Sequence, residues 1–138
     1  MKKNVRETSI ISFLEIQEYK LGELQKKVLK IIKSSPFPLT DREIIKEIGI
    51  EGNSIRPRRN ELMKLGILEE AGKRRCTITK KLALTWKSKG SRKLFRVIDE
   101  NTMLQQEPIP SEEFYKLMKI MKEKGFRYNG SYEWKKIG

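Results

Sequence analysis

Apolar residues recur every three or four positions through the first half of the chain, a pattern typical of short amphipathic helices. The first predicted helix covers about residues 8–19 and follows a Thr-Ser cap. The second covers about 21–34, where two prolines in three residues stop it. Thr40 and Glu43 match a capping box for a third helix, which Gly49 ends.

A fourth helix, rich in arginine, follows a Gly-containing connection. We place it from Ile55 to Leu65 with Ser54 as its N-cap, because Pro57 then lies in the first turn, where its missing N–H is not needed. If Asn53 were the cap, the proline ring would press on the Asn53 carbonyl. Two short helices joined by such a turn, the second one basic, form a helix-turn-helix pattern.

The apolar period then changes to two, which indicates strands. A strand opens at Ile67-Leu68, turns at 71–73 and returns at 76–79, and a further strand covers 82–86. A hairpin directly after a helix-turn-helix pattern is a wing.

The C-terminal part predicts a small module. Its elements are a strand at 94–98, a Pro-bounded loop, a helix capped by Ser111, and a hairpin around Asn129-Gly130. The fold class that follows for the whole chain is α+β and mainly helical, a winged helix-turn-helix with an appended strand–helix–hairpin module. The predicted segments are an N-terminal helix (1–20), the helix-turn-helix domain with its wing (21–87), a polar linker (88–93) and the C-terminal module (94–138).

Charge is distributed unevenly along the chain. The 138 residues include 31 Lys and Arg against 18 Asp and Glu, a net charge of +13. Ten of the basic residues lie between Ala71 and Ile98, where no acid occurs, whereas residues 99–138 are neutral. A solvated surface is one explanation. Because the basic residues are concentrated in one stretch, a polyanionic partner is favoured, nucleic acid above all. The apolar residues of this stretch recur every two positions, which argues against a basic helix on a membrane surface.

Composition excludes much enzyme chemistry. The chain has no histidine and one cysteine, Cys76, which rules out an internal disulfide, a Cys-cluster zinc site and a His-activated nucleophile. We expect Cys76 to be a buried small side chain. We therefore predict no enzyme activity, no cofactor and no metal. No apolar run is long enough for a membrane span and no signal peptide is apparent, so we expect a cytoplasmic protein without a membrane partner.

Several segments together resemble one family: Leu39-Thr40-Asp41-Arg42-Glu43-Ile44, Asn53 to Leu62, Gly66 to Cys76, and Trp86. They resemble the small winged helix-turn-helix proteins of the MarR-like type, especially those of bacteriophages and prophages. The resemblance covers about residues 8–87. It implies double-stranded DNA binding and a role in transcription regulation, in the host cytoplasm if the protein is phage-encoded. It also implies a homodimer, paired through the N-terminal helix or the tail.

If the resemblance holds, helix 55–65 lies in the major groove. Arg56 and Asn60 are the first candidates for base reading, because Arg bonds guanine and Asn bonds adenine with paired hydrogen bonds. Lys64 suits a phosphate. We expect Arg59 to pair with Glu43 or Glu47, which leaves Arg58 for DNA. The full predicted DNA-binding set is Arg42, Ser54, Arg56, Arg58, Asn60, Lys64, Lys73, Arg74 and Arg75.

Two other functions remain open. The protein could be a winged-helix module that docks on a polymerase or replication protein, with the neutral C-terminal module as a protein contact. It could also be a replication or recombination accessory factor whose tail aromatics stack on single strands. Burial against the module's helix is the more frequent role of such aromatics in so small a domain, and we expect it for Phe126, Tyr128, Tyr132 and Trp134.

Overall fold

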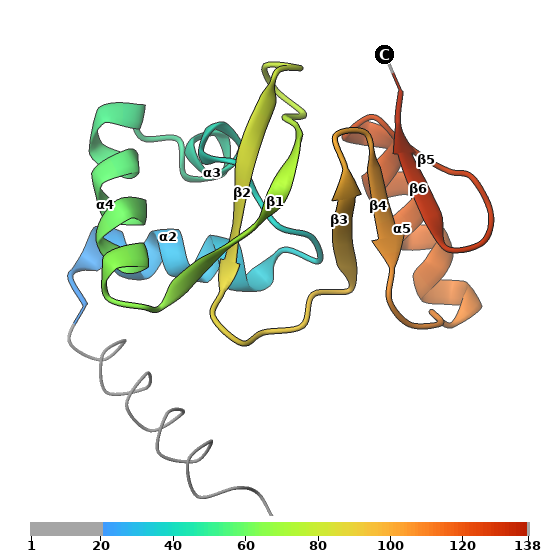
Figure 1. Ribbon diagram of the computed structural model, residues 1–138, viewed down its shortest axis with the longest axis horizontal. Helices are drawn as coiled ribbons and strands as arrows, with labels where there is room; N and C mark the ends of the chain where they lie inside the picture. The colour runs from blue at the N-terminus through green and yellow to red at the C-terminus, as the bar shows by residue number, and fades with distance from the viewer. Residues whose placement is uncertain (1–20, 138) are drawn as a thin grey trace, which may run out of the picture.

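The computed structural model describes residues 21–137, so the helix predicted for residues 1–20 lies outside the described part of the chain. That part contains four helices and two antiparallel sheets (Figure 1). The α+β class is confirmed. The prediction of a mainly helical fold is wrong, because 39% of the described residues are helical and strands replace a predicted turn and a predicted loop.

The first two described helices start and stop where local signals require. α2 (Glu23–Ser34) ends just before the two prolines, as predicted. α3 (Asp41–Ile48) has the predicted capping box: the Glu43 amide donates to the Thr40 hydroxyl (3.3 Å), and the Thr40 amide donates to the Glu43 carboxylate (3.0 Å). Gly49 ends α3 with a φ of 77°, a left-handed conformation that suits glycine.

α4 (Gly52–Lys64) begins three residues earlier than predicted. Its N-cap is Glu51, so the predicted cap, Ser54, is the third helical residue and Pro57 lies inside the helix. The proline therefore removes the hydrogen bond that the Asn53 carbonyl would accept. Amides of the added turn donate to the Glu51 carbonyl, which stabilises this earlier start.

β1 (Leu68–Arg75) and β2 (Leu82–Ser88) form an antiparallel hairpin whose turn differs from the prediction. β1 continues through the predicted turn at 71–73, where the ladder has a bulge and Gly72 has a φ of 97°. The actual turn spans 76–81, so the predicted return strand is the turn itself. The turn was predicted in the wrong place because a glycine in a β-bulge looks the same in the sequence as a glycine in a turn.

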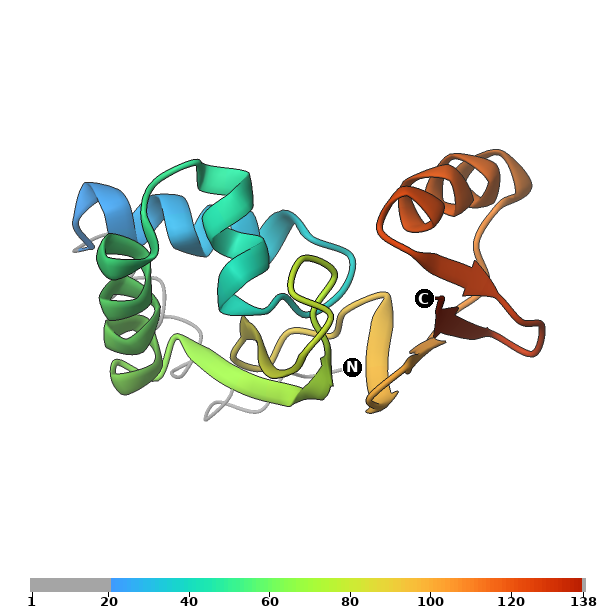
Figure 2. The same cartoon turned by 90° about the horizontal axis from the view of Figure 1, so that it is seen from above.

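The C-terminal half forms a second sheet with one helix. Its strand order is β3-β4-β6-β5, and all neighbours are antiparallel. α5 lies along one face of this sheet (Figure 2). The bounds are β3 (Phe95–Asp99), β4 (Thr102–Gln105), α5 (Ser111–Glu123), β5 (Phe126–Tyr128) and β6 (Glu133–Lys136).

Sequence patterns predicted this half less completely. β4 was not predicted, because its four residues follow a two-residue turn without glycine and have no clear alternation. The hairpin at Asn129-Gly130 is confirmed, since this dipeptide lies in the loop between β5 and β6. α5 starts at Ser111 itself, with Pro110 as its N-cap, so the predicted capping role of Ser111 is wrong.

The two halves share one apolar core. Phe37, in the loop after α2, lies with its ring centroid 6.5 Å from that of Phe95 and 6.2 Å from that of Phe126. Trp134 is fully buried and contacts Phe95 edge-on. Burial of Phe126 and Trp134 confirms their predicted role, whereas Tyr132 is 40% exposed. Within residues 21–137, no helix is long and apolar enough to cross a membrane.

Candidate nucleic-acid interface

The outer side of α4 carries the side chains predicted to read bases. Ile55 and Leu62 are fully buried and fix the inner side of the helix. Arg56 and Lys64 are exposed and Asn60 is half-buried, and all three project away from that inner side. The structure thus brings these three residues onto one accessible helix face.

A cleft of about 460 Å³ runs between α4, the start of α3 and the hairpin. We call it the basic cleft. Arg42 lines it from the first turn of α3, and Arg56 lines it from α4. Thr79 lines it from the hairpin turn. In Figure 1, α4 and the hairpin stand side by side, with α3 between their upper ends.

Lys73 lies on the face of the hairpin that borders the basic cleft. In the β1–β2 ladder Lys73 lies opposite Leu84, which lines the basic cleft, and directly opposed residues project from the same face of a sheet. Lys73 is exposed. Within residues 21–137, no acidic side chain lies within salt-bridge distance of Arg42, Arg56 or Lys73. These three cations are therefore available to an anionic partner.

Arg59 is an internal part of the cleft wall. Its guanidinium donates two hydrogen bonds of 2.8 Å to the Asp41 carboxylate and lies 4.1 Å from the centre of a Trp86 ring. The predicted pairing with an acid of α3 is right in kind, but the predicted partners are wrong. Glu43 is bound by another arginine, and Glu47 faces Lys124 at 3.7 Å.

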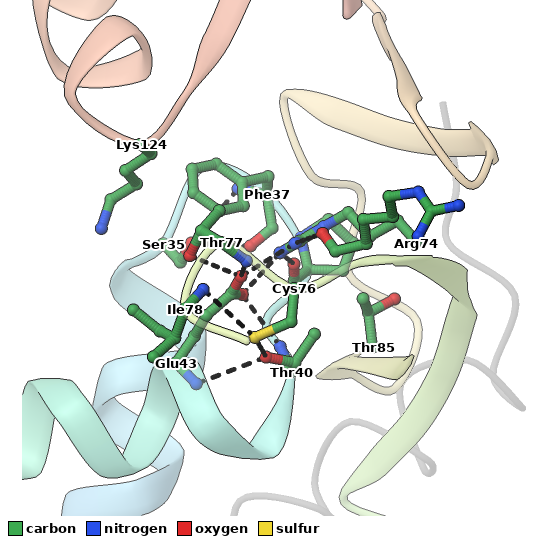
Figure 3. A network of polar contacts seen from close by, with 12 residues as sticks. Ser35, Phe37, Thr40, Glu43, Arg74, Cys76, Thr77, Ile78, Thr85 and Lys124 are labelled. Atoms are coloured by element: carbon green, nitrogen blue, oxygen red, sulfur yellow. Dashed lines mark hydrogen bonds and ion pairs between the residues drawn. The ribbon is translucent and has the colours of Figure 1, made fainter. Parts of the chain in front are cut away.

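Arg74 was expected to contact DNA from the wing, and this prediction is wrong because the side chain is only 1% exposed. Its terminal nitrogens donate to Glu43 at 2.6 and 2.9 Å and to the Pro38 carbonyl at 2.6 Å. The Phe37 ring centre lies 5.3 Å from its guanidinium. Figure 3 shows this network, in which Glu43 lies among Arg74, Thr77 and Thr40.

Glu43 ties α3 to the hairpin turn. Besides Arg74, its carboxylate accepts hydrogen bonds from the Thr77 amide (2.9 Å) and hydroxyl (2.8 Å) and from the Thr40 amide. Burial by itself would raise the pKa of Glu43, but the bond and charge of Arg74 and the two amides together hold that pKa below its ordinary value. The carboxylate is therefore ionised, and it fixes where the turn starts.

Three other wing cations differ in availability. Arg75 is half-exposed and pairs with Glu100 of the C-terminal half at 3.5 Å. Lys80 and Lys81, at the end of the hairpin, are exposed. Lys80 completes the turn with a φ of 64°, a left-handed conformation that residues other than glycine adopt only uncommonly. The exposed cations at the tip of the hairpin are therefore Lys80 and Lys81. The sequence prediction placed the tip at residues 71–73 instead.

Ser54 and Arg58 do not join the basic cleft. Ser54 lies two residues before Arg56, which places their side chains about 160° apart around the helix. Arg58 pairs with Glu61 at 2.5 Å, and Glu61 accepts a bond from Gln25 of α2. Arg58 therefore belongs to the side of α4 that contacts α2, and Ser54 is exposed one turn before it.

Cys76 is buried, as predicted. Its sulfur lies 3.1 Å from the Thr40 hydroxyl and accepts a bond from the Ile78 amide (3.4 Å). It helps to hold the hairpin turn against the start of α3. Among residues 21–137, no three His, Cys, Asp or Glu side chains cluster as metal ligands would.

No protein-family model and no curated protein matches the sequence. The function of the basic cleft is therefore inferred from its geometry and charge.

Proposed function

We propose that residues 21–88 form a winged helix-turn-helix that binds duplex DNA through α4 and the hairpin. The observation that carries the proposal is that Arg42 and Arg56, from two helices, line one cleft without acidic partners of their own. The exposed Lys73 extends this charge onto the hairpin, because it lies opposite Leu84, which also lines the cleft. A duplex presents a continuous row of phosphates, which such a surface matches. The proposal involves no catalytic step, cofactor or metal.

In this proposal α4 enters the major groove. Arg56 and Asn60 contact base edges, because both occupy the outer side of the helix, Arg56 in its N-terminal half and Asn60 one turn further on. Arg42, Lys64, Lys73 and Lys81 contact the phosphates on either side. The resemblance to phage and prophage regulators makes transcription regulation the biological role that we propose, with a homodimer as the binding unit.

Binding to single-stranded nucleic acid through stacked aromatics has less support. Phe126 is 2% exposed and Trp134 is fully buried, so neither ring is available to a base. No observation in the described residues favours docking on a polymerase either.

Selection from a random duplex library near physiological salt tests the proposal. We expect a defined motif, as an inverted repeat for a dimer. Arg56→Ala should relax one position of that motif, at a cost of about 1–3 kcal/mol for the preferred base. Lys73→Ala should weaken all sites about equally and flatten the salt dependence.

The matched control is Arg58→Ala, on the same helix but on the side of α2, which should leave the motif unchanged. Equal effects of the Arg56 and Arg58 variants would contradict the assignment of the reading face. Retention without any motif, or preference for single strands, would contradict sequence-specific duplex binding and would favour an accessory role in replication.

A further inference from the structure

A second cavity lies on the opposite side of the hairpin, between the hairpin, the segment after β2, and β3. Its volume is about 510 Å³, within the range of small-molecule sites. Lys87 lines it, one residue after Trp86, whose ring contacts Arg59 of α4. Because successive strand residues project to opposite faces, this cavity and the basic cleft lie on different faces of the hairpin.

The charges around this cavity are all of one sign. It is lined by Lys87, Arg92, Lys93 and Arg96, and no Asp or Glu of residues 21–137 lines it. Glu69, on the neighbouring strand, binds Lys87 at 3.0 Å and offsets one of the four charges. Three cations remain without an acidic partner in the described part of the chain.

Lys93 adds positive charge to the cavity, but its ammonium group is already hydrogen-bonded within the protein. It is 7% exposed, and its ammonium donates to the carbonyls of Ile32 (2.5 Å) and Ser35 (2.6 Å) at the end of α2. Burial and the nearby Lys87 ammonium lower the pKa of Lys93. The fold therefore holds like charges close together here, an arrangement that a bound anion would relieve.

Arg92 and Arg96 supply the accessible donors. Both are exposed. Arg92 uses one nitrogen to bond the Gln106 carbonyl (3.2 Å). The Arg96 side chain has no hydrogen bond or ion pair within residues 21–137. Guanidinium groups bind phosphate through paired, charge-assisted hydrogen bonds.

The rest of the lining is apolar or small. Pro38, Ala71 and Val97 contribute apolar surface beside the cations. A volume of this size exceeds what a phosphate ion alone would fill. A ligand that combines one phosphate with a flat, largely apolar group matches both parts of the lining.

We propose that this cavity binds a nucleotide phosphate, with Arg92 and Arg96 on the phosphate and the nucleoside against Pro38 and Val97. The phosphate belongs either to a free mononucleotide or to the 5′ end of a nucleic-acid strand. The site is separate from the basic cleft and does not depend on duplex binding there.

The test uses the full chain without duplex DNA, followed by amide NMR shifts. Adenosine 5′-monophosphate should bind saturably and shift the amides of Gly72, Ser91 and Val97, whereas adenosine should not. A short single strand with a 5′-phosphate, compared with the same strand without it, distinguishes a strand end from a free nucleotide. Equal binding of adenosine and its monophosphate, or no saturable shift with either phosphorylated probe, would overturn the proposal.

Three variants locate the binding. Arg96→Gln should weaken binding of the monophosphate about tenfold, as expected for a lost charge-assisted bond. Ala71→Leu fills the cavity without changing charge and should abolish binding. Arg127→Gln, an exposed cation of the same sheet that does not line the cavity, is the matched control. Equal losses in the Arg96 and Arg127 variants would show nonspecific attraction and overturn the proposal.

Discussion

Two short basic runs have similar compositions, Arg56-Pro57-Arg58-Arg59 on α4 and Lys73-Arg74-Arg75 on β1, yet the fold uses their members in different ways. In each run one arginine reaches back to an acid in the first turn of α3. Arg59 binds Asp41, with the two side chains 14% and 22% exposed, and Arg74 binds Glu43, with both nearly fully buried. In each run another cation, Arg56 or Lys73, stays free.

This comparison shows that a basic run is not a uniform surface. Asp41 and Glu43, the two acids in the first turn of α3, each bind one arginine and thereby fix α4 and the hairpin on either side of the basic cleft. The paired arginines position the walls of the basic cleft, whereas the free cations, Arg56 and Lys73, are exposed. The following predictions separate these roles.

The largest effect should come from Arg74→Ala. Removing this guanidinium leaves the buried Glu43 carboxylate without its counter-ion, and breaking such a pair costs about 3–5 kcal/mol. Urea unfolding of the variant and of Lys73→Ala measures the difference. The Lys73 variant should stay within about 0.5 kcal/mol of the parent, as expected for an exposed side chain. Equal losses in both variants would contradict the division of roles.

Lowering the pH should weaken the Arg74–Glu43 pair and reduce the free energy of unfolding. The reduction should be smaller than that caused by Arg74→Ala, because protonation neutralises Glu43 and leaves no unpaired buried charge. The folded state holds the pKa of Glu43 below its ordinary value, through Arg74 and the Thr77 and Thr40 amides, although burial opposes this. Its stabilisation is therefore present above the ordinary carboxyl pKa of about 4.3 and is lost as the pH falls through the lower pKa of the folded state.

Glu43→Gln isolates this contribution. The difference in unfolding free energy between the parent and Glu43→Gln should be largest near neutral pH and should shrink as the solution is acidified. Urea titrations at a series of pH values measure it. A difference that stays constant into the acid range would mean that Glu43 does not titrate as the contacts require.

Local signals explain how much of this arrangement could be predicted from the sequence. The capping box of Thr40 and Glu43 and the stop at Gly49 act within one or two helical turns, and both predictions are confirmed. The fate of Arg74 depends on Glu43, which lies 31 residues earlier, and on the Phe37 ring. Residue spacing along the chain does not indicate a contact between such distant residues. The sequence therefore could not distinguish the buried Arg74 from an exposed arginine.

The misplaced turn has the same origin. Gly72 lies in a bulge, and a bulge glycine and a turn glycine give the same sequence signal. The turn instead lies at 76–81, where Cys76 contacts Thr40, the N-cap of α3, and Thr77 donates to Glu43 in the first turn of α3. The outer face of α4 was predictable in spite of its shifted start, because Ile55 and Leu62 set the helix orientation by themselves.

Of the two arginine–carboxylate pairs, the smaller effect should come from Arg59→Ala. This pair is partly solvated, so its loss removes a bidentate bond and the contact with Trp86 but leaves Asp41 able to reach water. We expect a loss of about 1–2 kcal/mol in urea unfolding, less than for Arg74→Ala. Arg59→Lys keeps the charge but not the paired geometry and should recover only part of that loss. A loss as large as that of Arg74→Ala would show that exposure does not separate the two pairs.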